Sequence, residues 1–413
     1  MTTGTMDGPS LEWDPMAQFV GTVAGDSRTP YPGFHAKRRD TPVEERHNLS
    51  FDGSDTGETM YYVYRYDDVA TVLRDNVTYC SGGIREMLET VMGPYPLVGM
   101  DEPEHKRLRS LVAQAFRQKT LAHWNDDLVG PVVDATIDTF VERGEAELVR
   151  EFTFLYPVQV IGALLGLPRE DYQYFQPRAL ALTNVAAQPA AGLRASAELR
   201  EYFEGILEAR RREPRGDLIS ELVNAELDGE RLGDEEIFSF LRLLLPAGAE
   251  TTYRATGNFL FGLLTHRDQF EALAADRTLM TQAIEETIRW ESPLTITSRT
   301  STRASELAGV TIPAGANVVA GVGSANHDPS RWSDPDVFDI FQPVVPHIAF
   351  GVGLHMCLGM HLARMEMATA VNRLIDRCPN LRFDEEAFAR DDAHIHGENF
   401  RSPTTLPVLF DPA

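Results

Sequence analysis

The chain has 413 residues, 43% of them hydrophobic, and a formal net charge of −24. That length is ample for a large core, and the acidity argues against binding to nucleic acid or to anionic lipid, apart from local basic patches. The sequence contains no run of 18 or more apolar residues, so no membrane-spanning helix is expected.

The chain contains three cysteines, Cys80, Cys357 and Cys378. Because they are few and odd in number, they argue against a disulfide framework and favour a reducing compartment, so we expect a cytoplasmic protein. The amino-terminal stretch is polar and acidic and is interrupted by Pro9 and Pro15. This composition predicts no signal peptide.

The first half of the chain is predicted to begin irregularly and to become helical. Residues 1–55 are rich in glycine, proline and aspartate, which predicts an irregular segment. Residues 61–74 have the pattern of a strand followed by a helix. Residues 81–100 contain four glycines and are predicted to form a long, partly ordered loop. Helical patterns then continue from 101 to about 230, with a break at the alanine-rich stretch 183–197.

The second half is predicted to be organised around one long helix. Asp234, followed by two acids, has the pattern of a helix start, and the apolar run that follows extends to about His266. Thirty-odd helical residues would span about 50 Å. The fold class predicted is mainly α with a small β portion. The other predicted elements are a helix over 278–290, strands over 294–299 and 310–320, an irregular segment over 325–349 and a helix after Cys357.

The most informative stretch runs from Phe350 to Gly359 and reads F-G-V-G-L-H-M-C-L-G. A cysteine binds a metal as the thiolate, a form that the amino terminus of a helix favours. Glycines allow the backbone to approach closely and to turn N–H groups toward the sulfur, while Phe350 would shield it from water. The residues alone thus indicate either a thiolate held against a flat metallocofactor or a buried, inert cysteine after a glycine turn.

This spacing resembles the haem-binding loop of the cytochrome P450 monooxygenases, and the likeness extends from about Tyr61 to Phe410. The resemblance implies a single cytochrome P450 haem domain over residues 1–413, with haem b between the long helix and the helix after the loop. It implies Cys357 as the iron ligand. It also places Phe350, Gly351 and Gly359 in contact with the haem.

A second motif, Ala247 to Thr252, lies within the long helix and reads A-G-A-E-T-T. A carboxylate beside an alcohol in an apolar helix needs a reason, because burying a charge is costly. Gly248 is predicted to open a dent into which the Thr251 hydroxyl turns. The motif resembles the family's A-G-x-[DE]-T signature, which implies Glu250 as a proton carrier and Thr251 as the alcohol on the oxygen side. The alternative is that these side chains only satisfy backbone carbonyls.

Glu286 and Arg289 are three residues apart on a predicted helix, so they can form an ion pair. By itself such a pair is usually an exposed salt bridge that contributes little. The resemblance implies instead a buried structural pair that a third, basic residue usually completes. Gln342 stands at that position here. Arg331 or a nearby backbone group is therefore expected to complete the cluster.

Two further groups follow from the resemblance. His105 and Arg109 are one helical turn apart, and with Arg299 and His355 they match the positions that bind the two haem carboxylates. The substrate pocket is expected to be largely apolar, which favours a lipophilic substrate, although such residues also occur in ordinary cores. Its expected residues are Met92, Leu243, Leu244, Ala247, Leu294, Thr295, Ile296 and Phe400.

The resemblance implies a monooxygenase that uses dioxygen and electrons from NAD(P)H. The sequence has no fused flavin domain and no G-x-G-x-x-G after a strand, so a separate iron–sulfur ferredoxin and its reductase are expected as partners. Two alternatives are a peroxide-driven peroxygenase and a non-catalytic haem protein that binds or senses a ligand. The intact Glu250–Thr251 pair argues against the first alternative.

Overall fold

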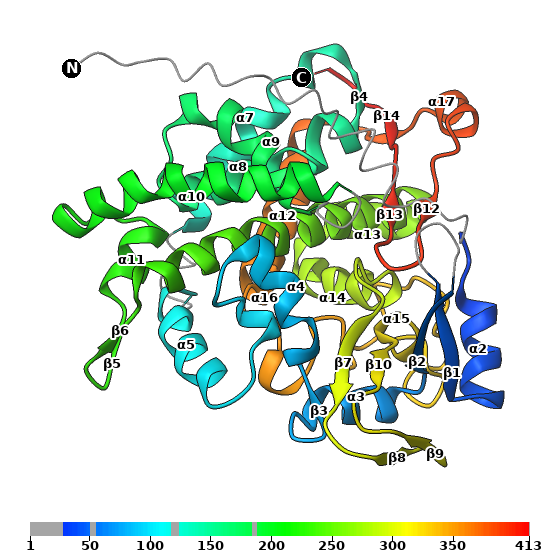
Figure 1. The fold of residues 1–413 in the computed structure, drawn as a ribbon. Helices are drawn as coiled ribbons and strands as arrows, with labels where there is room; N and C mark the ends of the chain where they lie inside the picture. The colour runs from blue at the N-terminus through cyan, green and yellow to red at the C-terminus, as the bar shows by residue number, and fades with distance from the viewer. Residues whose placement is uncertain (1–27, 50–54, 117–123, 184–187, 413) are drawn as a thin grey trace.

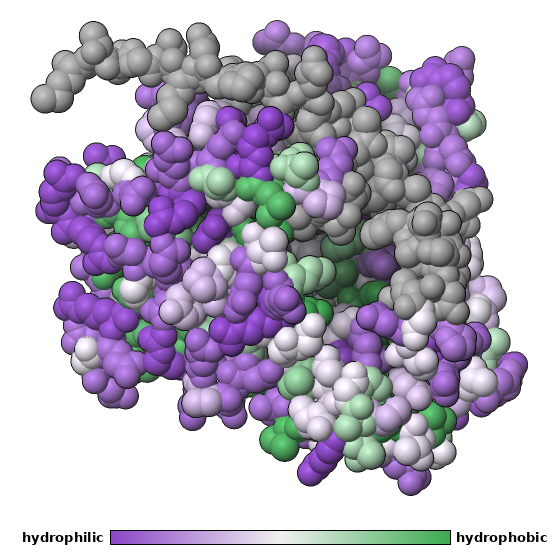
Figure 2. All heavy atoms as spheres, in the orientation of Figure 1, coloured by the Kyte–Doolittle hydropathy of each residue, from purple (hydrophilic) through white to green (hydrophobic). Residues whose placement is uncertain are grey.

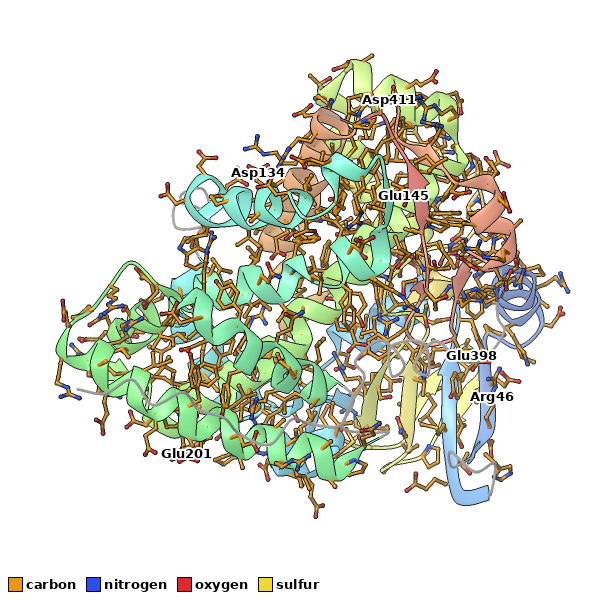
Figure 3. All side chains as sticks on the ribbon, turned by 90° about the horizontal axis from the view of Figure 1, so that it is seen from above. Arg46, Asp134, Glu145, Glu201, Glu398 and Asp411 are labelled. Atoms are coloured by element: carbon orange, nitrogen blue, oxygen red, sulfur yellow. The ribbon has the colours of Figure 1, made fainter. Side chains whose placement is uncertain are left out.

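The computed structural model describes residues 28–49, 55–116, 124–183 and 188–412, which form a mostly helical body with a small β part along one side (Figure 1). Figure 3 views the body from above and places Glu201, on a long helix, and Arg46, in a strand, at opposite edges. The predicted fold class is confirmed.

Helices make up most of the described residues, and several are joined by short 3-10 or π turns. The α-helices are α2 (Tyr31–Asp40), α3 (Tyr66–Arg74), α4 (Arg85–Met92), α5 (Glu104–Val112), α7 (Gly130–Ile137), α8 (Tyr156–Leu164), α9 (Tyr172–Thr183), α10 (Pro189–Arg212), α11 (Leu218–Asn224), α12 (Asp234–Thr265), α13 (Arg267–Ala275), α14 (Met280–Trp290), α15 (Val322–Ala325), α16 (Met360–Arg377) and α17 (Glu385–Arg390).

The largest sheet has the strand order β1-β2-β10-β7-β3. Its central strand β10 runs parallel to β2 and antiparallel to β7, with Val318 opposite Tyr61 on one side and Arg299 on the other. This pairing fixes the backbone of Arg299. The strands of this sheet are β1 (Val43–Leu49), β2 (Asp55–Val63), β3 (Tyr79–Cys80), β7 (Thr297–Ser301) and β10 (Asn317–Ala320).

The remaining strands form small sheets at the edges of the body. One has three strands in the order β11-β14-β4, and the others are pairs. These strands are β4 (Glu145–Glu147), β11 (Arg382–Phe383) and β14 (Pro407–Leu409), with the pairs β5 (Glu226–Leu227) and β6 (Glu230–Arg231), β8 (Ser305–Leu307) and β9 (Val310–Ile312), and β12 (Ile395–His396) and β13 (Ser402–Pro403).

Helix α12 passes through the centre of the body, and its 32 residues correspond to about 48 Å. The structure places the N-cap at Gly233 rather than at the predicted Asp234, and the Glu236 carboxylate accepts a hydrogen bond from the Gly233 N–H at 2.9 Å. The helix continues through Pro246. A large hydrophobic cluster surrounds α12, and a smaller one lies between α3 and the main sheet.

Three sequence predictions about local structure were wrong. Residues 1–55 are not irregular throughout, because α2 and β1 lie within them, while residues 1–27 are outside the described part. Strand β1 forms by pairing with β2, Val43 opposite Val63, which a local pattern does not reveal. The 81–100 loop contains α4, with Val91 and Met92 buried on its inner side. Helix α10 begins at Pro189, so residues 189–197 of the predicted break are helical, while residues 184–187 lie outside the described part.

Other predictions agree with the structure. No regular element follows α15 until Gly353, as predicted for 325–349, and α16 follows Cys357. None of the described helices is both long and apolar enough to cross a membrane.

Candidate functional site

The loop before α16 holds Cys357 in a conformation that only glycines allow. Gly351 and Gly353 have φ values of 69° and 78°, in the left-handed region. A Cβ on Gly353 would lie 2.9 Å from the Leu73 carbonyl oxygen of α3. The Cys357 N–H donates to the Phe350 carbonyl at 2.8 Å and closes the loop. The sulfur is therefore positioned by backbone geometry.

Cys357 is crowded by protein but keeps exposed surface. Burial raises the pKa of its thiol, although a hydrogen bond from the Gly359 N–H and the charges of Arg109 and Arg364 act in the opposite direction. From this combination we infer that the residue lies on a concave surface, which we call the cavity. A metal in that cavity would convert it to the thiolate.

The middle of α12 also has accessible surface, and we infer that it faces the same cavity. Ala247 is exposed, and Pro246, Gly248 and Thr251 are partly exposed, whereas residues 237–245 and 252–260 of this helix are buried. The Thr251 hydroxyl donates to the Ala247 carbonyl at 3.0 Å. Gly248 was predicted to open a dent in the helix for the Thr251 hydroxyl. The structure indicates another role for this glycine, because a Cβ there would lie 3.0 Å from the Ile161 side chain of α8. Gly248 serves the close packing of α8 on α12.

Glu250 is buried on another side of α12, where Arg254 binds it. The two side chains are 2.8 Å apart, and Arg254 also donates to the Ser402 hydroxyl at 3.1 Å. Burial raises the pKa of Glu250, while the Arg254 charge lowers it. Sequence reasoning missed Arg254, although its position four residues after Glu250 was a sufficient signal.

The four predicted haem-carboxylate donors lie together at one edge of the cavity. The rings of His105 and His355 have centroids 4.1 Å apart. Burial and the charge of Arg109 lower the pKa of His105 to about 4. Burial, His105, Arg299 and Arg109 lower the pKa of His355 to about 3. The two arginines thus make protonation of the histidines less favourable, and the Asp101 carboxylate acts on His105 and Arg299 in the opposite direction.

This group of bases fits the two carboxylates of haem. Both ring nitrogens of His105 and Nε2 of His355 are buried without a hydrogen-bond partner among the described residues, which is costly unless a ligand supplies one. Arg299 is buried, and within the described chain no carboxylate forms an ion pair with it. The charge of Asp101 raises the pKa of Arg299, but the Asp101 carboxylate accepts its hydrogen bonds from the N–H groups of Ser81 and Gly82.

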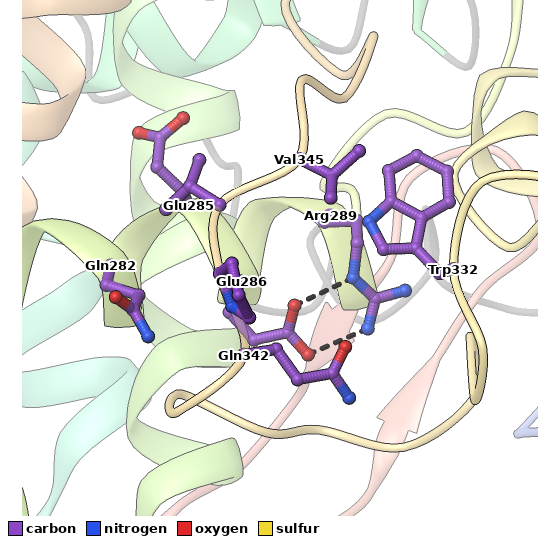
Figure 4. A pocket seen from close by; sticks show the side chains of 9 residues that line it. Gln282, Glu285, Glu286, Arg289, Trp332, Gln342 and Val345 are labelled. Carbon is purple, nitrogen blue, oxygen red and sulfur yellow. Dashed lines mark hydrogen bonds and ion pairs between the residues drawn. The ribbon is translucent and has the colours of Figure 1, made fainter.

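Figure 4 shows the Glu286–Arg289 pair on α14. Both Arg289–Glu286 hydrogen bonds measure 2.7 Å, and both side chains are buried. The backbone completes the cluster: Arg289 donates to the carbonyls of Asn326, Pro335 and Val337. Gln342 lines the adjoining crevice.

Arg331 takes no part in that cluster and lies over the Tyr66 ring at 4.4 Å. Of the two groups expected to complete the Glu286–Arg289 pair, the backbone carbonyls are therefore the ones that do so.

The predicted pocket residues fall into two groups. Ala247, Leu294, Ile296 and Phe400 have accessible surface, and Leu294 forms an isolated β-bridge with Phe400. Met92, Leu243 and Leu244 are almost fully buried. Thr295 is also buried, and its hydroxyl donates to the Glu398 and Asn399 carbonyls, so it holds two segments together. The surface in Figure 2 is mostly hydrophilic but is hollowed near its centre, with hydrophobic residues at depth.

The known proteins that this chain resembles belong to one family. The sequence profile of the family Cytochrome P450 matches residues 45–381. The steroid C26-monooxygenase of Mycolicibacterium smegmatis is 36% identical over 340 residues, 81% of this chain and 83% of that enzyme. The erythromycin C-12 hydroxylase of Saccharopolyspora erythraea is 37% identical over 366 residues, 85% and 89% of the two chains.

A solved structure is similar over almost the full length. CYP109E1 from Bacillus megaterium, in complex with testosterone, has a TM-score of 0.82 and 29% identity, and the match covers 93% of this chain and 99% of that one. The profile match includes both α12 and the Cys357 loop.

Proposed function

The chain belongs to the cytochrome P450 family, and from this premise we propose which of its residues bind the cofactor, move protons and meet the substrate. The protein is a haem-thiolate monooxygenase that uses haem b, dioxygen and electrons derived from NAD(P)H. Bound haem supplies the activation of dioxygen, and the polypeptide supplies ligation, orientation and protons.

Cys357 binds the iron, and His105, Arg109, Arg299 and His355 bind the two carboxylates. The observation that carries this assignment is that both ring nitrogens of His105 and Nε2 of His355 are buried without a hydrogen-bond partner among the described residues. They lie in one group with Arg109 and Arg299, and Arg109 also acts on Cys357. Phe350 shields the sulfur, with Arg364 over its ring at 4.4 Å. These contacts fix the cofactor in one orientation.

Thr251 and Glu250 supply protons. The Thr251 hydroxyl has accessible surface, donates its proton to the Ala247 carbonyl and keeps lone pairs that can accept hydrogen bonds from the cavity; rotation of the hydroxyl would turn its proton there. Glu250 is buried behind it, where burial and Arg254 act on its pKa in opposite directions. A carboxylate whose pKa lies nearer to neutrality is better suited to exchange protons. A water molecule between Glu250 and Thr251 would connect them, since the two side chains leave α12 in different directions.

The substrate is a lipophilic small molecule, and the electrons come from an iron–sulfur ferredoxin and its reductase. The apolar residues at the cavity support the first statement, and the membership of the chain in this family supports the second. Three free cysteines are consistent with a cytoplasmic location.

The test is oxygen labelling. The purified protein, a ferredoxin, its reductase and NADH are incubated with a panel of lipophilic compounds under ¹⁸O₂. One labelled oxygen atom in the product is expected. Label-free product formed only with added peroxide would favour the peroxygenase alternative, and substrate-independent NADH oxidation without product would favour the ligand-binding alternative.

A further inference from the structure

Glu285 of α14 holds two basic side chains next to the Cys357 loop. Its carboxylate points away from that of the adjoining residue, Glu286 (Figure 4). Both Nε and Nη2 of Arg364, on α16, donate to this carboxylate, the second at 2.8 Å. Nε2 of His347 lies 3.2 Å from the same carboxylate. We call Glu285, His347 and Arg364 the Glu285 cluster.

The surroundings of His347 determine which of its nitrogens carries the proton. The side chain is 4% exposed, and its Nδ1 accepts a hydrogen bond from the Ala349 N–H at 3.2 Å. A neutral imidazole has one donor and one acceptor nitrogen, so the proton is on Nε2, which faces Glu285. Burial would raise the pKa of Glu285, but its contacts with Arg364 and His347 lower it to about 2. Glu285 is therefore ionised, and the charge of Arg364 compensates it.

Both basic side chains of the Glu285 cluster contact the ring of Phe350. The Arg364 guanidinium lies 4.4 Å from the centroid of this ring. The His347 ring is 5.9 Å from it, at an interplanar angle of 36°. The Phe350 carbonyl accepts the hydrogen bond from the Cys357 N–H that closes the loop. Glu285 thus positions, from another helix, the two groups that pack on a residue bonded to the cysteine.

The charge of Arg364 also acts on the thiol of Cys357. Burial raises the pKa of this thiol, whereas the charges of Arg109 and Arg364 lower it and so favour the thiolate. The two cations differ in their partners. Arg109 is placed to meet a haem carboxylate, while Arg364 is bound to Glu285. Because an anion at this distance offsets the field of a cation on a third group, Glu285 determines how strongly Arg364 acts on the sulfur.

We propose that Glu285 is a positioning residue that sets the electron donation of the Cys357 thiolate, because it holds Arg364 in place and offsets its charge. The inference rests on the proposed function, since it assumes that Cys357 binds the haem iron. Charges and hydrogen bonds around a ligand tune the reduction potential of its metal. One-electron reduction adds negative charge, so an uncompensated cation nearby stabilises the reduced state. Glu285 therefore keeps the haem harder to reduce.

The test is spectroelectrochemical titration of the haem-loaded protein at pH 8, with the Fe–S stretching frequency from resonance Raman spectra as a second readout. Glu285→Gln keeps the shape of the side chain and should shift the equilibrium toward ferrous haem by about threefold to tenfold, at about 59 mV per tenfold. Its Fe–S frequency should fall. Arg364→Met, or Arg364→Gln if the first does not retain haem, should shift both readouts the opposite way. The double variant should return close to the unmodified protein.

Arg277→Met is the matched control, because it removes a cation bound to Asp376 of the same helix α16 at 3.0 Å. Asp376 is about 18 Å along α16 from Arg364, so the equilibrium should change less than about 1.5-fold. Shifts of the same sign in Glu285→Gln and Arg364→Met would indicate a purely structural role and overturn the proposal, as would an unchanged potential in Glu285→Gln. Either result leaves the red-shifted Soret band of the reduced carbon monoxide complex in place, whereas failure of the proposed function removes it from the unmodified protein.

Discussion

The loop that carries Cys357 is fixed by backbone geometry, whereas the junction of α4, α10 and α12 is held by side-chain contacts. In the first, left-handed glycines and the Cys357–Phe350 hydrogen bond leave the loop one conformation. In the second, Ser196 and Arg242 supply the polar contacts between helices. The comparison teaches that a loop fixed by its backbone tolerates few substitutions, whereas side-chain contacts between helices can be replaced one at a time.

The largest effect on the cofactor side is expected for Arg289→Leu. This variant leaves the Glu286 carboxylate buried without its partner, which costs about 3–5 kcal/mol of unfolding free energy. Urea unfolding of the haem-loaded protein measures the loss. Gln342→Arg, which adds a cation beside the pair, is the control and should change the free energy by less than about 0.5 kcal/mol. Equal stability of Arg289→Leu and the unmodified protein would show that the pair is not structural.

Gly353→Ala tests whether backbone geometry fixes the Cys357 loop. The left-handed φ and the contact with the Leu73 carbonyl should together cost about 1–3 kcal/mol and weaken haem retention. Gly309→Ala is a matched control, because Gly309 has a φ of 80° but open space around its Cα. If both variants lose haem equally slowly, the contact with α3 has no role in holding the loop.

The sequence predicted the features that depend on local residue patterns and missed those that depend on contacts between distant segments. The Cys357 loop and the Glu286–Arg289 pair were predicted because their residues have short, fixed spacings, whereas the grouping of His105, Arg109, Arg299 and His355 was predicted from the family resemblance. Strand β1 and helix α4 were missed, because β1 depends on pairing with β2 and α4 is held by contacts with α10 and α12. The role of Gly248 was misassigned, since it depends on Ile161 from a distant segment. Local patterns do not contain such long-range contacts.

Thr251→Ala tests the proposed role of the Thr251 hydroxyl in proton supply. The variant should retain haem and substrate binding, but product formed per NADH oxidised should fall by about tenfold or more, with peroxide formed instead. The reason is loss of the only hydroxyl in the Ala247–Thr252 motif that has surface toward the cavity among the described side chains. Thr252→Ala, at a buried position, should keep its coupling. Unchanged coupling in Thr251→Ala would assign the proton role to another group.

The smallest effect is expected at the electron-donor surface near Cys357. Ferredoxins are generally acidic, so a basic patch around the helix α5 is the expected docking surface, but Arg107 is paired with Glu236, and Arg364 with Glu285. Lys106 is exposed, and no described carboxylate pairs with it. Lys106→Glu should slow reduction by ferredoxin a few-fold at low salt, with the difference disappearing as ionic strength rises. Arg373→Glu, beside Asp134, is the comparison, and a larger effect there would move the docking site.

The central claim is that Cys357 binds the haem iron as a thiolate, and the spectrum of the reduced carbon monoxide complex tests it most directly. The freshly purified protein should contain one haem b and show the red-shifted Soret band of thiolate ligation. Cys80→Ser and Cys378→Ser should leave this band in place, and Cys357→His should replace it with an imidazole-type band. An imidazole-type band in the folded, unmodified protein would contradict the account.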